Sequence, residues 1–278
     1  MSRISAKGRW SHALMRGLTR FIFAIAGLFA PRKPSPGDAL SWQAALISWM
    51  ANLVVPYRHL RFCSMRRLYR LQTIAFNVDA AVMERVEELD VNADLSVRIY
   101  RPFEADSMGP ALLFFHGGGY VIGSLRTHDT LCRYIADGAK MVVIAVDYGL
   151  APERPFPAAL DDAAAAFNWL AANAGKLGVD AARIALGGDS AGGGLVAAMA
   201  LERRWNGGGP GPAGLWMVYP WLEIYGAYPS HQEFEKKLLL AKPLIDLFQS
   251  AFPGPGVAPD DIRHSPGLAG DVSGLPPC

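Results

Sequence analysis

Four short runs of apolar residues constrain the fold of this chain more than any other feature. None of them alternates apolar with polar residues, so each suits a strand that is buried on both faces, as in a parallel sheet. A helical pattern at 158–176 separates the second run from the third, with Asp161 and Asp162 in its first turn. Gly175 and Gly178 end this helix. The runs are residues 111–115, 141–146, 183–186 and 214–219. Strands alternating with helices predict an α/β fold: a mostly parallel sheet with helices on both faces.

The part of the chain before the first run has a different pattern. Residues 31–38 are rich in proline and read as a linker, and residues 39–73 follow a helical period. Residues 83–91 and 95–102 alternate around a short turn, which predicts an antiparallel hairpin. We therefore divide the chain into a basic, helical N-terminal region (1–80) and an α/β region (81–278).

Charge separates the same two parts of the chain. Residues 1–75 contain twelve Lys and Arg against one acidic residue, and the remainder contains fifteen basic and twenty-four acidic groups. Attraction between the two parts is the simplest interpretation, and contact with an anionic surface is the alternative. No nucleic-acid motif accompanies the charge. The apolar segment 21–30 is too short to span a bilayer. We prefer a structural or peripheral membrane helix over a signal peptide as its interpretation, and we rank a membrane span last.

The 278 residues suffice for one large domain and a smaller appendage. The three cysteines show neither disulfide nor zinc-site spacing, so no zinc site is expected, and a reducing, cytoplasmic location is the default expectation. The oligomeric state stays open.

The third apolar run leads into Gly-Asp-Ser-Ala-Gly (188–192) and then a helical stretch. This is the Gly-x-Ser-x-Gly nucleophile elbow in the strand-to-helix context that it requires. Ser190 then sits at the apex of a strained turn, and Gly188 and Gly192 are small because side chains there would collide. A glycine-rich loop with an incidental serine is the alternative, but the Gly-Lys-Ser/Thr of a phosphate loop is absent.

A second glycine-rich motif, His116-Gly-Gly-Gly-Tyr120, ends the first apolar run. In lipases and esterases such a loop supplies backbone N–H groups to the oxyanion of acyl transfer. The predicted donors are the amides of Gly117, Gly118, Gly119 and Ala191. His116 and Asp189 are expected to support these motifs, with His116 as a structural anchor and not as the catalytic base.

Together these motifs resemble the hormone-sensitive-lipase-like esterases of the α/β-hydrolase superfamily. Further matching segments are residues 146–162, 218–222 and 265–277, so the resemblance covers roughly 80–278. It implies an N-terminal helical cap over residues 1–80 and hydrolysis of short to medium acyl esters without a cofactor. Gly149 departs from the family's usual arginine, which removes a local polar support. Gly194 stands where asparagine is common.

The largest departure concerns the partners of Ser190. In this family the catalytic acid and histidine follow the segment that resembles 273–277, and this sequence ends at Cys278. We therefore expect a C-terminally truncated chain that lacks its last core strands, leaves 215–219 as an uncovered apolar edge and is weak or inactive alone. A non-catalytic binding protein is the alternative. Residues judged unsuitable as base or acid are His231, His264, Asp246, Asp260, Asp261 and Asp271; His12, His59 and His128 read as surface or core histidines.

Overall fold

The computed structural model describes residues 61–206, 211–233, 240 and 242–278. The chain forms two compact units: residues 1–78 with 227–247, and residues 79–226 with 248–278. Described helices of the first unit are α3 (Phe62–Phe76) and α7 (Pro229–Glu233), while α8 (Lys242–Ala251) enters the second unit at Phe248. The apolar segment 21–30 and most of the expected helical cap lie outside the described residues, so the cap stays a prediction.

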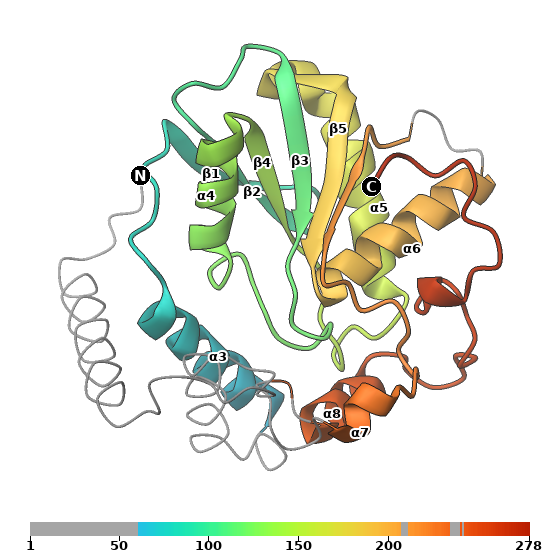
Figure 1. Cartoon of the computed structure of the whole chain (residues 1–278). Helices are drawn as coiled ribbons and strands as arrows, with labels where there is room; N and C mark the ends of the chain where they lie inside the picture. The colour runs from blue at the N-terminus through green and yellow to red at the C-terminus, as the bar shows by residue number, and fades with distance from the viewer. Residues whose placement is uncertain (1–60, 207–210, 234–239, 241) are drawn as a thin grey trace, which may run out of the picture. The chain divides into compact units, whose positions relative to one another are not determined.

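The second unit is built on a mixed six-stranded sheet with the order β1-β2-β4-β3-β5-β6 (Figure 1). Its strands are β1 (Arg85–Asp90), β2 (Ser96–Arg101), β3 (Gly109–Phe115), β4 (Val142–Asp147), β5 (Val179–Asp189) and β6 (Leu215–Val218). The last four run parallel to one another, and each apolar run of the sequence overlaps one of them. The mostly parallel α/β architecture predicted from these runs is confirmed.

The predicted hairpin is also confirmed, as antiparallel β1 and β2 with Leu89 opposite Val97. Leu95, Val97 and Ile99 are buried, as their alternation predicts. Strand β2 then pairs antiparallel with β4, which joins the hairpin to the parallel strands.

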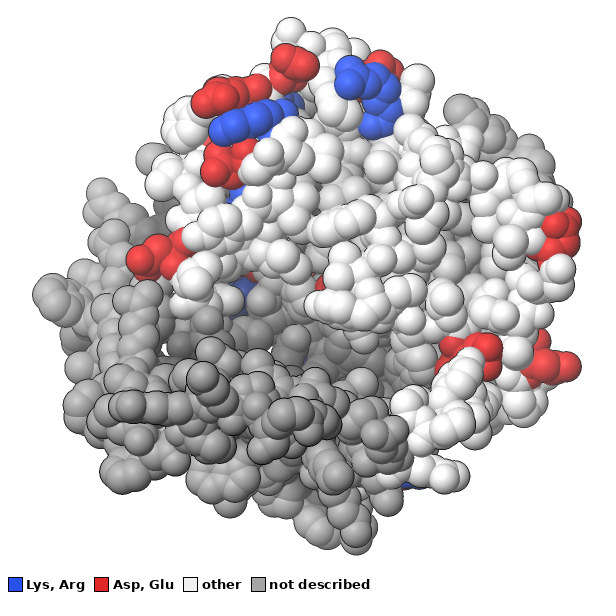
Figure 2. All heavy atoms as spheres, in the orientation of Figure 1, with Lys and Arg blue, Asp and Glu red and all other residues white. Residues whose placement is uncertain are grey.

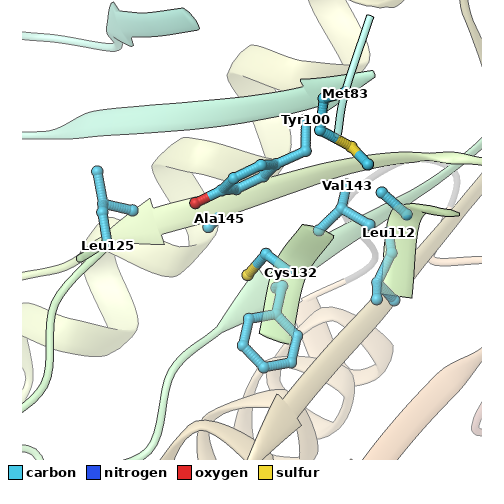
Figure 3. Packing of buried hydrophobic residues seen from close by; sticks show 9 residues of the cluster. Met83, Tyr100, Leu112, Leu125, Cys132, Val143 and Ala145 are labelled. Atoms are coloured by element: carbon cyan, nitrogen blue, oxygen red, sulfur yellow. The ribbon is translucent and has the colours of Figure 1, made fainter. Parts of the chain in front are cut away.

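One face of the sheet packs against α4 (Asp129–Ala139). Tyr100 of β2, Leu112 of β3 and Val143 of β4 lie in one cluster with Cys132 of the helix (Figure 3). All four side chains are almost completely buried. Because side chains alternate along a strand, the residues next to them point to the opposite face, which explains why the strands read as continuous apolar runs.

The opposite face is covered by α6 (Ala191–Asn206), which packs on β3, β5 and β6 and against α5 (Ala158–Asn173). Helices therefore lie on both faces, as predicted. The helix expected at 158–176 is α5 followed by a 3-10 turn, η2 (Ala174–Leu177), and Gly178 ends it in the left-handed conformation. A second 3-10 turn, η3 (Pro266–Leu268), follows α8 in the chain.

Strand β6 is the edge of the sheet among the described strands. The N–H of Leu215 donates to the carbonyl of Pro277 at 2.8 Å, so the C-terminal segment lies against the start of this strand. Further along, Trp216 and Tyr219 are 43% and 74% exposed. The predicted apolar edge is thus partly covered at its first residue and open beyond it.

Charged side chains on the described surface in Figure 2 lie at its rim, and acidic and basic groups stand side by side along the upper part. Arg98, for example, pairs with both Glu88 and Asp129. Within the described ranges, no helix has the length and apolar character needed to cross a bilayer.

Candidate active site

Ser190 occupies the turn between β5 and α6 in a strained conformation. Its φ is +52°, in the left-handed region that a residue with a side chain rarely adopts. Its N–H donates to the carbonyl of Val218 at 2.9 Å. Its own carbonyl accepts from the amides of Gly194 and Trp221 at 3.0 and 2.9 Å. The backbone of Ser190 is therefore held by the helix below it and by the segment after β6, which maintains the strained turn.

The glycines around Ser190 make this turn sterically possible. A Cβ on Gly188 would collide with the backbone of Gly192 across the turn. A Cβ on Gly192 would collide with the carbonyl of Phe115, at the end of the neighbouring strand β3. The expected collision across the turn is thus found at Gly188, whereas Gly192 is small because β3 approaches it.

The loop after β3 brings a second set of amides close to Ser190. This follows because Phe115 of β3 pairs with Gly188 of β5, so both strands end on the same side of the sheet. Gly118 and Gly119 have φ values of +128° and +61°. The amides of Val121 and Ile122 both donate to the carbonyl of Gly118, at 3.1 and 2.9 Å, which closes a tight turn. This turn fixes the backbone that carries the amides of Gly118 and Gly119.

Three of the four predicted oxyanion donors are unused within the described structure. None of the described residues accepts a hydrogen bond from the amides of Gly118, Gly119 or Ala191. Ala191 is the first residue of α6, where the helix leaves N–H groups unsatisfied and favours negative charge. The fourth amide, that of Gly117, donates to Asp189 Oδ1 at 2.9 Å. Gly117 therefore anchors the loop, and its N–H is occupied.

Aromatic side chains pack closely on this loop. The ring of Phe248 fills the space that a side chain on Gly119 would need. Tyr120, also with a positive φ of +62°, stacks on Phe252 with ring centroids 3.7 Å apart. These contacts leave little room for the loop to change conformation, which suits donors that must be in place before the reaction.

His116 lies under the loop as a buried, neutral side chain. Its Nδ1 is 2.9 Å from the carbonyl of Gly117, and no described group pairs with its Nε2. Tyr148 stacks on the ring and donates its hydroxyl to the His116 carbonyl at 2.6 Å. Burial, and then the neighbouring His128, lower the pKa of His116 from 6.5 to about 3. These contacts agree with the role of structural anchor that the sequence indicates.

No described side chain hydrogen-bonds to the hydroxyl of Ser190. His264 is buried, with Nε2 2.9 Å from the carbonyl of Ala258 and Nδ1 2.7 Å from the hydroxyl of Ser265. Because a carbonyl can only accept, we assign the ring proton to Nε2 and let Nδ1 accept from Ser265. Both ring nitrogens of His264 are thus engaged.

The remaining histidines fall into three groups. His231 belongs to the first compact unit, in α7, and its ring lies edge-on to Tyr228. His12 and His59 lie outside the described residues. His128, which reads as an ordinary histidine in the sequence, is buried with its Nε2 3.4 Å from Asp189 Oδ1. No local sequence motif around His128 predicts its contact with Asp189.

Two of the three departures from the family pattern, those at Gly149 and Gly194, have structural explanations. The space beside Gly149 is filled by the guanidinium of Arg154, which donates to both oxygens of Asp162 at 2.6 and 2.9 Å. The expectation that polar support is lost at this position is therefore wrong, because Arg154 supplies it. A side chain on Gly194 would collide with the carbonyl of Trp221, so asparagine does not fit there.

Metal chemistry has no candidate centre in the part of the chain that is described. No group of three or more His, Cys, Asp and Glu side chains lies close enough together there to hold an ion.

Known proteins resemble this chain in sequence and in structure. A family model described as alpha/beta hydrolase fold matches residues 112–278. Carboxylesterase NlhH of Mycobacterium tuberculosis is 40% identical over 200 residues, which cover 70% of this chain and 62% of the relative. Ethyl acetate hydrolase of Pseudomonas putida is 37% identical over 235 residues, covering 80% of this chain and 72% of the relative. This chain thus spans less than two thirds of the mycobacterial relative.

Solved structures agree with these sequence matches. The hyperthermophilic esterase from the archaeon Pyrobaculum calidifontis superposes with a TM-score of 0.78 at 32% identity, covering 86% of this chain and 78% of that one. A sheet of this topology with a strained serine between strand and helix defines an α/β hydrolase. Within that superfamily, the chain belongs to the hormone-sensitive-lipase-like esterase family.

Proposed function

We propose that this chain carries the nucleophile and the oxyanion site of a carboxylic-ester hydrolase that acts on short or medium acyl esters. The observation that carries the proposal is Ser190 at φ +52° directly before the N-terminus of α6, with the amides of Gly118, Gly119 and Ala191 unused. Esterases among the relatives, including a carboxylesterase and an ethyl acetate hydrolase, support the substrate class.

In this mechanism the Ser190 oxygen attacks the ester carbonyl and forms the acyl–serine bond, and the alcohol leaves with a proton. The amides of Gly118, Gly119 and Ala191 hold the negative oxygen of the tetrahedral intermediate. The dipole of α6 adds to this stabilisation. Water then attacks the acyl–serine and releases the acid, which regenerates Ser190.

A general base must take the proton of Ser190, and the described residues do not provide one. The Ser190 hydroxyl has no hydrogen-bond partner there, and the ring nitrogens of His264 are engaged elsewhere. We therefore propose that residues 1–278 alone hydrolyse esters slowly. An oxyanion site and binding still accelerate hydrolysis about 10³–10⁴-fold in a serine protease without its triad.

The lack of a base among the described residues also favours a second candidate, a non-catalytic protein that binds small esters. An experiment with two readouts separates the candidates. The purified chain and Ser190→Ala are incubated with p-nitrophenyl acetate, with and without imidazole as an external base, and release of nitrophenolate is followed. In parallel, both proteins react with a p-nitrophenyl alkylphosphonate, and intact mass is measured.

In the second reaction the Ser190 oxygen bonds to phosphorus, nitrophenolate leaves with its electron pair, and the serine proton passes to buffer. Labelling of the wild type but not of Ser190→Ala, together with slow ester hydrolysis whose Ser190-dependent part imidazole accelerates, supports a nucleophile without a base. Rapid hydrolysis without imidazole would show that a base exists within residues 1–278. Absence of both labelling and Ser190-dependent hydrolysis favours the binding protein.

A further inference from the structure

The carboxylate of Asp189 joins two loops at the site. Its Oδ1 accepts the N–H of Gly117 at 2.9 Å and faces Nε2 of His128 at 3.4 Å. The carboxylate also fills the space beside the Gly117 Cα, where a side chain would collide with Oδ2. Asp189 precedes the nucleophile Ser190 by one residue, and Gly117 precedes the first unused donor, Gly118, by one residue. A shift of this carboxylate is therefore transmitted to both reacting parts of the site.

His128 contacts the same carboxylate oxygen as the Gly117 amide and is itself fixed. Its Nδ1 is 2.9 Å from the hydroxyl oxygen of Thr127. That oxygen also accepts the amide of Ser124 and lies 2.9 Å from the Ser124 carbonyl. The imidazole ring stacks on His116 with centroids 5.3 Å apart. With Nδ1 against Thr127, Nε2 is the ring nitrogen that faces the carboxylate.

Electrostatics keep Asp189 in the form that accepts these bonds. Burial by itself raises the pKa of Asp189, but the contacts with His128 and with the Gly117 amide outweigh it, so the pKa is lowered. A charged carboxylate is a stronger acceptor than a neutral one. The Gly117 N–H is consequently held more firmly than a neutral side chain would hold it.

We propose that Asp189 and His128 are positioning residues. His128 orients the Asp189 carboxylate, and the carboxylate fixes the Gly117–Gly119 loop in the position where its free amides face the substrate oxygen at Ser190. This inference rests on the proposed function, because it assigns the two residues a role in that reaction. Neither touches the substrate. Their effect is on the geometry of the transition state, where a 1 Å misplacement costs about 100-fold in rate.

The test measures phosphonylation of Ser190 by the p-nitrophenyl alkylphosphonate, in imidazole buffer, as a maximal rate constant kinact and a half-saturation constant KI. The variants are Asp189→Ala, Asp189→Asn, His128→Ala and His128→Gln. Asparagine keeps an oxygen for the Gly117 amide, and glutamine keeps an N–H near the position of Nε2. The matched control is His264→Ala, which removes another buried histidine with two bonded nitrogens whose contacts lie outside both loops.

We expect kinact to fall about 100-fold in Asp189→Ala and about 10-fold in His128→Ala, per folded molecule, with little change in KI. Asp189→Asn and His128→Gln recover most of the rate. His264→Ala keeps the wild-type kinact. A second readout, hydrogen–deuterium exchange of a peptide covering 112–123, becomes faster in the two alanine variants of the pair and not in the control. This exchange readout does not depend on the reactivity of Ser190.

The outcomes separate this inference from the function on which it rests. If wild type is not labelled at Ser190, both the function and the positioning role are wrong. If wild type is labelled and the Asp189 and His128 variants keep its kinact and its exchange rate, only the positioning role is wrong. The same holds if His264→Ala loses as much kinact as His128→Ala, because the effect is then general destabilisation. Should Asp189→Ala fail to fold, the two conservative variants and His128→Ala decide the question.

Discussion

Arg154 offers the sharpest test of how this chain compensates for Gly149. The guanidinium donates two hydrogen bonds to Asp162, at 2.6 and 2.9 Å, and the Gly149 amide donates a third at 2.8 Å. The Asp162 side chain is only 8% exposed, whereas that of Arg154 is 39% exposed. Removal of Arg154 thus leaves a buried carboxylate with one of its three donors.

The expected cost follows from these exposures. Breaking a fully buried ion pair costs about 3–5 kcal/mol, and exposed pairs contribute about 0–1 kcal/mol. With one partner buried and the other half-exposed, Arg154→Ala should lower the free energy of unfolding by about 2 kcal/mol. The matched control is Arg263→Ala, because Arg263 also holds both oxygens of its partner, Asp261, but is 49% exposed. It should cost less than about 1 kcal/mol.

The double variant Gly149→Arg, Arg154→Ala then tests the compensation itself. A Cβ on Gly149 would lie 2.6 Å from Nη1 of Arg154, so an arginine that starts at position 149 enters the same space. We expect it to recover at least about 1 kcal/mol of the loss. The assay is urea unfolding followed by circular dichroism. The reasoning is refuted if Arg154→Ala costs no more than Arg263→Ala, or if the double variant is no more stable than Arg154→Ala.

Three further predictions concern the site and its surroundings. Gly188→Ala places a methyl group against the Gly192 backbone, so phosphonylation of Ser190 should fall at least about 100-fold by intact mass; wild-type labelling would contradict the steric argument. His264→Ala leaves the Ser265 hydroxyl without one partner and should cost about 3 kcal/mol in urea unfolding, and a loss under about 1 kcal/mol would mean that these bonds contribute little. The pKa of His116 falls from 6.5 to about 3 on folding, so between these pH values the unfolded chain binds the proton and the folded chain does not. Stability should therefore decrease as pH falls through this window, by up to about 1.4 kcal/mol per pH unit, and this slope should be smaller in His116→Gln; an equal slope would assign the proton uptake to other groups.

Much of the fold was predictable because its signals are local. Buried parallel strands need apolar residues on both faces, so 111–115 and 141–146 read as strands without further information. The elbow was predictable for the same reason: a strand, a strained turn and a helix are consecutive in the chain, and Gly188 and Gly192 are needed wherever they pack so closely.

Other features depended on contacts that spacing does not reveal. The sequence offers four equivalent-looking amides for the oxyanion, and the structure removes that of Gly117 because Asp189 reaches it from 72 positions away. His128 looks like an ordinary histidine until the fold places it against the same carboxylate. Arg154 does not look like a replacement for the arginine missing at 149, since only the turn between them brings the guanidinium to Asp162.

The sequence by itself therefore determined the class of fold and indicated Ser190 as the nucleophile. Both follow from short-range steric rules: strand and helix periodicity, and the small residues that let Ser190 turn into α6. Only the tertiary structure decided which amides remain free and which side chains hold them. Those assignments depend on the register of β3 beside β5, which brings Gly117 next to Asp189. A buried amide must then find an acceptor, and whichever amide does so is no longer available to the substrate.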